Sequence, residues 1–356
     1  MNRRTAAFLA VLVLVSICNR SSGKALLQGD RIVIVGERNS LASVAADIAD
    51  SEIFDFDPER DVALANRNIV IKGILLVGSN ETPGDSLARF QMLEMNVSRC
   101  GAVRIDITAS PGEVGELHLR RAKVTAIHET DDKCSDPNLL IVAGKLIAHN
   151  SELSGNIQCL VSPTGFVELV GSTISYTQNA ALVCELKEPQ RLDIRNSAFI
   201  DNANYGIHIA SSSDVLEIRD SVFRGLAADV FHAGSGEVVL TDCDFRTVRF
   251  GSLPGKVVRK WTTTLEVPRG GLHVVATSAR DNPQRETVRG ISDENGLCRL
   301  ALTEYVAFPP RAQEFQEGVN NATPHEICVY DADGKTLLYK IENFHVFMKG
   351  QKATLR

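Results

Sequence analysis

Residues 192–202 read LDIRNSAFIDN, and residues 216–226 read LEIRDSVFRGL. Each stretch has an apolar residue at its first position, numbered 0 here, then an apolar residue at +2, a small residue at +5 and an apolar residue at +7. Position 0 of this pattern falls at Leu117, Leu139, Val167, Leu192, Leu216 and Val238, with fainter matches at Ile69 and Leu93. A pattern that returns every 22 to 28 residues indicates a repeat protein.

Each copy of the repeat reads as three short strands. Apolar and polar residues alternate on either side of position +4, which is the period of a strand. Position +4 holds Asn196, Asp220 and Asp242 in three copies, and these residue types tolerate the left-handed backbone of a sharp bend. The segment 205–209 (YGIHI) and its equivalents supply a third strand after a loop.

Copies of this kind stack in parallel, about 4.8 Å apart, so that like residues lie over like residues around one apolar core. A larger side chain at +5 would push the bend outward, which explains why only Ala, Gly, Ser or Cys occurs there. The sequence therefore predicts an all-β chain whose main part is a right-handed parallel β-helix.

Residues 66–250 resemble the pectate-lyase-type right-handed β-helix repeat family, and the stretch LDIRNSAFIDNANYGIHIASSSD (192–214) is close to its generic rung. In that family an Asn-bearing bend often forms a ladder, to which Asn196, Asp220 and Asp242 are similar. The resemblance implies a fold and says little about activity, because hydrolases, lyases and non-catalytic adhesins share it.

An N-terminal cap is expected over residues 26–65. Leu41, Val44, Ala45 and Ile48 recur at helical spacing, and Ser40 is a suitable N-cap, so a short helix is predicted to cover the first rung. The acidic stretch FDFDPERD offers carboxylates for Ca²⁺, although a solvated turn at Pro58 explains it more simply.

A second domain is expected over residues 256–356, after a linker that contains Gly251, Pro254 and Gly255. Alternating segments separated by turn signals predict a small β-sandwich of the immunoglobulin-like kind. The stretches SDENGLCRLALTEY (292–305) and TPHEICVYDADGK (323–335) resemble carboxypeptidase-regulatory-like (transthyretin-type) sandwich domains, which usually accompany another domain. A hairpin turn closed by Gly296 explains the polar residues 293–295 better than a metal site does.

Residues 1–25 are typical of an export signal, with Arg3 and Arg4 before an apolar stretch that is too short to span a bilayer. Lipidation at Cys18 is the alternative. We therefore expect a secreted, periplasmic or cell-surface protein without a transmembrane segment. Seven cysteines follow Cys18, and this odd number favours buried thiols; a Cys298–Cys328 disulfide is the alternative.

Charge argues against nucleic acid as a partner, because the chain has 38 basic and 44 acidic residues and a net charge of −6. Alternation places Gln158, Val183, His208 and Phe231 outward on the third strands of four copies, the face along which substrates lie in the family that the chain resembles. The face lacks the paired carboxylates of a glycosidase. The best catalytic candidates are His208 with Asp201 and Asp229 from the neighbouring loops.

Ligand binding has three candidates. Phe231 offers a surface on which a sugar ring can stack, and the stacked Arg195 and Arg219 can hold an acidic sugar. Charge pairing of these arginines with Asp193 and Glu217 across rungs is the simpler explanation.

We therefore expect an exported, non-catalytic binding or structural protein whose partner is a polysaccharide or a cell-surface component. It needs no cofactor, Ca²⁺ being the alternative. A polysaccharide lyase or glycoside hydrolase with an unusual site around His208 is the alternative function.

Overall fold

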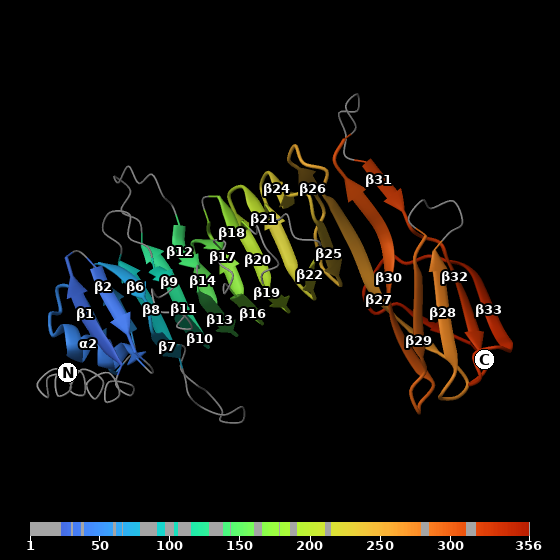
Figure 1. The fold of residues 1–356 in the computed structure, drawn as a ribbon, viewed down its shortest axis with the longest axis horizontal. Helices are drawn as coiled ribbons and strands as arrows, with labels where there is room; N and C mark the ends of the chain where they lie inside the picture. Colours follow the sequence, from blue (N-terminus) through green and yellow to red (C-terminus); the bar gives the residue numbers. More distant parts are fainter. Residues whose placement is uncertain are drawn as a thin grey trace, which may run out of the picture. The chain divides into compact units, whose positions relative to one another are not determined.

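The computed structural model shows an all-β chain with one helix among the residues that it describes (Figure 1). The described residues are 23–29, 31–36, 39–59, 62–65, 67–78, 91–96, 103–105, 115–127, 138–142, 144–159, 166–177, 179–185, 191–210, 215–278, 285–310 and 318–355. Most of the expected export signal, with Cys18, lies outside them. No helix in the described part of the chain is both long enough and apolar enough to cross a membrane. Contacts divide the chain into two compact units, Met1–Glu185 with Asp201–Ala203 and Leu186–Ile200 with Asn204–Arg356.

Successive strands of the first unit belong in turn to three sheets. The first sheet contains β1 (Lys24–Gln28), β2 (Arg31–Val35), β6 (Asn68–Ile71), β9 (Val103–Ile105), β12 (Asn138–Val142), β15 (Asn156–Cys159) and β18 (Ala180–Cys184). The second contains β3 (Asn39–Ser40), β7 (Ile74–Gly78), β10 (Glu116–Arg120), β13 (Lys145–His149) and β16 (Phe166–Val170). The third contains β4 (Phe54–Asp57), β5 (Val62–Ala65), β8 (Gln91–Asn96), β11 (Ala122–Ile127), β14 (Glu152–Ser154) and β17 (Thr173–Ser175). Neighbouring strands are parallel, except β1 with β2 and β4 with β5.

The register corrects three of the expected copies of the repeat. Leu117 pairs with Leu146, which pairs with Val167, so position 0 of the intervening copy is Leu146 and not Leu139. Position 0 of the preceding copy is Leu75 and not Ile69. Leu93 occupies position +7, opposite Val124. The expectation was wrong because the end of β12 and the start of β13 together imitate the apolar spacing of a first strand.

The sharp bend after the first strand is confirmed and extends to more copies than expected. Position +4 has a left-handed backbone in six copies, and the six φ angles lie between 50° and 62°, at Arg121, Asn150, Gly171, Asn196, Asp220 and Asp242. The residue at +5 is buried in every one of these copies, at Ala122, Ser151, Ser172, Ser197, Ser221 and Cys243.

The serine hydroxyls at +5 connect neighbouring copies, in what is called the serine ladder below. The Ser221 hydroxyl accepts the backbone N–H of Ser197 at 3.2 Å and donates to the Arg219 carbonyl at 2.8 Å. Ser151 does the same between Ala122 N–H, at 3.2 Å, and the His149 carbonyl, at 2.9 Å. Position +5 is therefore small for a polar reason as well as a steric one, because the hydroxyl satisfies a buried backbone donor.

Helix α2 (Leu41–Ile48) confirms the helix expected near the N-terminus. Ser40 is its N-cap, and the side chains and backbone N–H groups of Ser40 and Ser43 hydrogen-bond reciprocally. Leu41 and Val44 are buried, and the helix packs against β1 and β4. The first half of the acidic stretch that follows is β4 (Phe54–Asp57), and a turn begins at Pro58, where the Asp57 carboxylate accepts the Glu59 N–H at 2.9 Å.

The second unit begins with the same three-way distribution of strands. One sheet contains β21 (Tyr205–Ile209), β24 (Ala228–His232) and β26 (Val248–Phe250), and another contains β23 (Val222–Gly225) and β20 (Ala198–Asn202), of which the last two residues are assigned to the first unit. The largest contains β19 (Arg191–Arg195), β22 (Val215–Arg219), β25 (Glu237–Thr241), β27 (Lys256–Glu266), β30 (Leu297–Phe308) and β31 (Gly318–Asn321), with β34 (Lys352–Thr354) beside β27. A separate antiparallel sheet has the order β29 (Thr287–Ile291), β28 (His273–Ser278), β32 (His325–Tyr330) and β33 (Leu337–Phe344).

Strand β27 has a parallel neighbour on one side and an antiparallel neighbour on the other. It is parallel to β25, with Val238 opposite Val257, and antiparallel to β30 along almost its whole length. The expected linker is therefore a short connection that leads straight into β27 at Lys256. Gly255 packs so closely on the buried ring of His232 that an added Cβ would lie 2.3 Å from its Nε2 atom.

The two facing sheets of the C-terminal part enclose one apolar core. Trp261, Leu265, Leu300 and Leu302 contribute from β27 and β30, and buried residues of β28 and β32 complete it. Cys298 points into this core, whereas the half-buried Cys328 lies outside it on β32. Both thiols are free, so the alternative of a Cys298–Cys328 disulfide is wrong.

An arginine at the start of β27 sits among three aromatic rings. The guanidinium carbon of Arg259 lies 4.6 Å from the ring centres of Phe245 and Trp261 and 5.7 Å from that of Tyr305. Glu304 lies 3.3 Å from Arg259 Nε and accepts the Trp261 indole N–H at 2.6 Å. A planar cation stacked on rings and held by a carboxylate therefore ties the repeat to the C-terminal sheets.

We predict that Ser221→Ala destabilises the protein by about 1–3 kcal/mol, because the buried N–H of Ser197 loses its acceptor. The measurement is urea unfolding followed through the fluorescence of Trp261, the single tryptophan of the chain. Ser221→Cys is the control, and it should lose less, since Cys243 occupies the equivalent position. Equal midpoints for wild type and Ser221→Ala would contradict the role of the ladder.

We predict that Arg259→Lys lowers the free energy of unfolding by about 1–2 kcal/mol, because a lysine keeps the charge and loses the flat stacking surface. The same fluorescence measurement reports it, and the emission of the folded state should also change because Trp261 touches the substituted side chain. Arg269→Lys, at an exposed ion pair with Asp331, is the matched control and should change neither value.

Candidate functional site

The outer face of β21 and β24 carries the residues that alternation predicted. His208 lies opposite Phe231, and Phe231 lies opposite Arg249 of β26, so the three side chains form one row across three strands. Ile207, Ile209 and Val230 point the other way and are fully buried. Gln158 and Val183 lie opposite each other on β15 and β18 of the first unit, but Val183 is buried, so its expected outward position is wrong.

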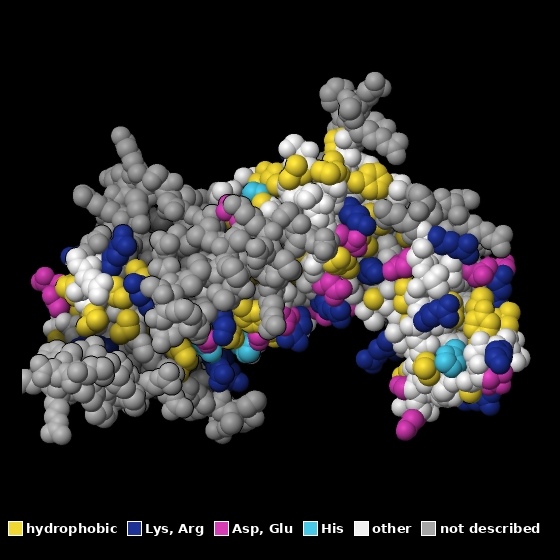
Figure 2. Space-filling model, in the orientation of Figure 1, with side chains coloured by type: hydrophobic (Ala, Val, Ile, Leu, Met, Phe, Trp, Pro, Cys, Tyr) yellow, Lys and Arg dark blue, Asp and Glu magenta, His cyan; other side chains and the backbone are white. Residues whose placement is uncertain are grey.

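Three rings gather at this row and form what is called the aromatic cluster below: Tyr205, His208 and Phe231, all half-buried. Tyr205 stacks on Phe231 with ring centres 4.6 Å apart and planes 14° apart. His208 lies 4.8 Å from Phe231 at 50° and 6.0 Å from Tyr205. Hydrophobic side chains gather over β24 and β26, the strands beside this cluster (Figure 2).

Tyr205 was missed at the sequence level. Strict alternation places it on the inner face with Ile207, but it begins the strand and its ring stacks on Phe231 of the next strand instead. Between Tyr205 and Ile207 lies Gly206, where an added Cβ would lie 2.6 Å from the Asp229 carbonyl oxygen. The glycine thus permits a close approach of the backbone of the next strand.

Arg249 adds a cation to the row. It is exposed, and within the described residues no carboxylate lies within ion-pair distance of it. Arginine beside an aromatic surface suits an anionic ring compound, because the rings take the apolar face and the guanidinium takes the charge.

Asp229 is buried, and its carboxylate is hydrogen-bonded to backbone N–H groups. Its carboxylate accepts the N–H of Gly225 at 3.1 Å and that of Arg246 at 2.6 Å, and the Arg224 guanidinium lies 3.9 Å away. This geometry holds the loop before β24 to the segment after Phe245. A carboxylate used in this way has a structural role and is poorly placed for proton transfer to a ligand.

Asp201, the other candidate carboxylate, is exposed and has a left-handed backbone with φ of 54°. It belongs to the first unit, whereas His208 belongs to the second. Among the described residues, no group of three or more His, Cys, Asp or Glu side chains is arranged to hold a metal ion.

Arg195 and Arg219 stack on neighbouring strands, as expected. Their ion pairs lie within each strand, so the charge pairing across rungs that the sequence suggested is wrong. Arg195 pairs with Asp193 at 2.8 Å, and Arg219 pairs with Glu217 at 2.8 Å. Side chains two apart on a strand share a face, so each arginine reaches its own strand's carboxylate.

A buried histidine in the C-terminal part was also missed, because nothing in its sequence surroundings distinguishes it. His325, at the start of β32, is 1% exposed, and its Nε2–H donates to the Thr303 carbonyl at 2.8 Å. The Thr303 hydroxyl donates to Glu286, which also accepts Lys260 at 2.6 Å. Burial, the largest influence, lowers the pKa of His325, whereas the Thr303 bond and the Glu286 charge act in the opposite direction.

We predict that the free energy of unfolding falls as the pH drops below about 6.5, the usual pKa of histidine. Because the folded-state pKa of His325 is lowered, the unfolded chain takes up the proton first, and stability present at neutral pH is lost on acidification. Urea unfolding at several pH values measures it. His325→Gln keeps an amide N–H for Thr303 and should show a smaller acid slope; equal slopes would contradict the assignment.

Comparison with known proteins supplies no relative for this arrangement, since no family model, no curated protein and no solved structure matches the chain.

Proposed function

We propose that this chain is an exported right-handed parallel β-helix, followed by a transthyretin-type β-sandwich, and that it binds polysaccharide without turning it over. The rotation of strands among three sheets and the left-handed bend at each +4 position support the helix. Two sheets around one core support the sandwich. The family identity of both parts is part of the proposal.

The observation that carries the binding proposal is the aromatic cluster next to Arg249. Sugar rings have apolar faces that stack on aromatic side chains, and the cluster presents three rings on an outward surface. Arg249 favours an acidic polymer over a neutral one. Arg195 and Arg219 contribute less, since a carboxylate already holds each of them.

The alternative is a polysaccharide lyase or glycoside hydrolase with His208 as a general base. His208 favours it, since an imidazole beside an aromatic ring surface is suited to proton transfer. The fixed carboxylate of Asp229 weighs against it, because a glycosidase requires a second acidic group that is free to reach the sugar.

The test is a binding and turnover panel of acidic and neutral polysaccharides with the full chain. We predict that Phe231→Ala weakens binding by about fivefold or more, because a stacking ring is lost. Arg249→Gln should weaken binding of the acidic polymers alone, and added salt should do the same. Tyr176→Ala, at an exposed tyrosine outside the cluster, is the matched control.

Unsaturated products and reducing ends are assayed in the same samples. Binding without product supports the proposal. Product formation that His208→Ala abolishes would replace it with the enzymatic alternative, and unchanged binding by Phe231→Ala would remove the cluster as the site.

A further inference from the structure

Strand β33 forms one edge of the separate antiparallel sheet in the C-terminal part (Figure 1). It pairs with β32 on one side, and in the described part of the chain no strand pairs with its other side. The strand is eight residues long. Its outer N–H and C=O groups therefore form a template on which a strand of another chain can pair.

The residues of β33 that pack against the apolar core are incompletely covered. Tyr339 and Ile341 both remain half-buried. Their partners on β32, Val329 and Ile327, are fully buried. The two strands differ because, among the described strands, β32 has a neighbour on each side and β33 has one. A further strand beside β33 would remove more of these two side chains from water.

Exposed apolar residues lie at both ends of the same strand. Leu337 and Leu338 begin it and are 50% and 38% exposed. Phe347 and Met348 follow shortly after its end and are 60% and 50% exposed. Large apolar side chains that gather along one edge mark an interaction surface, whereas singly scattered ones are ordinary.

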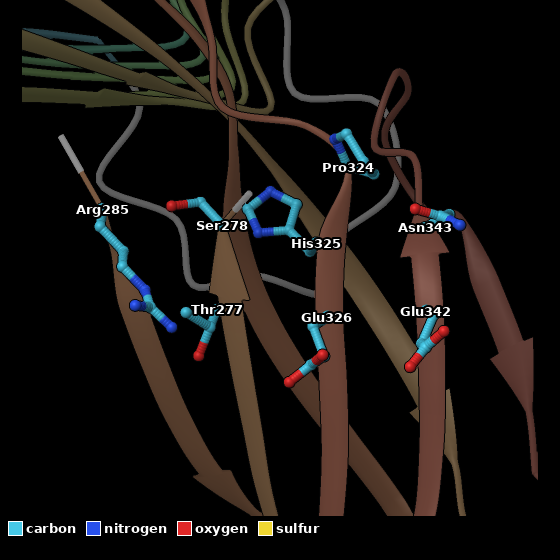
Figure 3. A pocket seen from close by; sticks show the side chains of 8 residues that line it. All are labelled: Thr277, Ser278, Arg285, Pro324, His325, Glu326, Glu342 and Asn343. Carbon is cyan, nitrogen blue, oxygen red and sulfur yellow. The ribbon is translucent and has the colours of Figure 1, made fainter. Parts of the chain in front are cut away.

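The outer face of β33 carries one charge of each sign. Lys340 and Glu342 are two residues apart and so share a face of the strand. Within one molecule Lys340 lies 2.8 Å from Glu326 and 2.7 Å from Glu342, and these two glutamates, on neighbouring strands, line a cavity of about 220 Å³ (Figure 3). A strand with opposite charges at i and i+2 is complementary to an antiparallel copy of itself, because each charge then meets its opposite.

We propose that two copies of this chain associate through β33, about a two-fold axis at Ile341. The two strands run antiparallel and join the two four-stranded sheets into one continuous sheet. Each Ile341 lies opposite its counterpart, and Lys340 of each copy lies opposite Glu342 of the other. The partner of this surface is therefore a second copy of the chain itself.

Charge selects this register over its neighbours. An axis at Lys340 would place the two lysines opposite each other, and an axis at Glu342 would do the same with the two glutamates. Like charges directly opposite each other destabilise a strand pair, whereas the axis at Ile341 gives two pairs of opposite charge.

The same register brings the apolar ends together. In an antiparallel pair the start of each strand lies beside the end of the other, so Leu337 and Leu338 of one copy approach Phe347 and Met348 of the other. This contact removes apolar surface from water. The interface is only about one strand wide, so we expect a reversible dimer with a dissociation constant of about 1–100 µM.

The experiment is sedimentation velocity of the full chain at concentrations from about 1 to 300 µM, which span the expected dissociation constant. The average mass should rise from that of a monomer to that of a dimer across this series. A chain that stays monomeric at every concentration overturns the proposal.

Charge reversal tests the register. Lys340→Glu and Glu342→Lys should each dimerise about tenfold more weakly, because like charges then face each other. An equal mixture of the two variants should dimerise again, since the acidic strand of one meets the basic strand of the other. Arg289→Glu, on the opposite edge strand β29, is the matched control and should dimerise as the wild type does.

Phe347→Ala tests the apolar ends and should weaken dimerisation several-fold. Ile291→Ala, on β29 and equally exposed, is its control. The urea midpoint of each variant shows that it folds, and the mixture of the two charge variants decides the question even if one of them is less stable. Dimerisation that Lys340→Glu leaves unchanged, or a mixture that associates no better than its components, overturns the proposal.

Discussion

The fold depends on how the chain turns between the first and second strand of each repeat. A left-handed residue at +4 gives the bend, and the backbone N–H that follows it is buried where no strand partner reaches it. The hydroxyl of a serine in the next copy supplies that partner, as Ser221 does for Ser197. A copy with serine at +5 therefore satisfies a buried donor of its neighbour, as Ser151, Ser172 and Ser221 do, and in these copies stacking is a polar requirement as well as an apolar one.

The same position shows why a cysteine is accepted there. Cys243 is buried, and its thiol points at the carbonyl of Thr241, at 3.4 Å, in the manner of the serines. Burial raises the pKa of Cys243 to about 12, so the group remains a neutral thiol at physiological pH. A thiolate there would be a buried charge without a partner, and its absence keeps the position compatible with the serine copies.

Much of the architecture could be predicted from the sequence, because the pattern at positions 0, +2, +5 and +7 encodes burial directly. The helix behind Ser40 and the left-handed bends followed from residue types with strong local preferences. The register of the early copies could not be predicted from the sequence. Leu139 fits the apolar spacing as well as Leu146 does, and only the strand pairing distinguishes the two. Of the candidate site, His208 and Phe231 were placed by alternation, whereas Tyr205 and His325 depend on contacts between strands that sequence periodicity does not contain.

The shared strand β27 has a consequence for the integrity of the molecule. It pairs with β25 over the whole length of that strand, Glu237–Thr241, and β30 in turn pairs with β27. A chain that ended before Lys256 would leave the N–H and C=O groups of β25 facing water, as a template on which strands of other molecules could assemble. The C-terminal part thus protects the exposed edge of this one sheet, whereas the other two sheets end at β26 and β23.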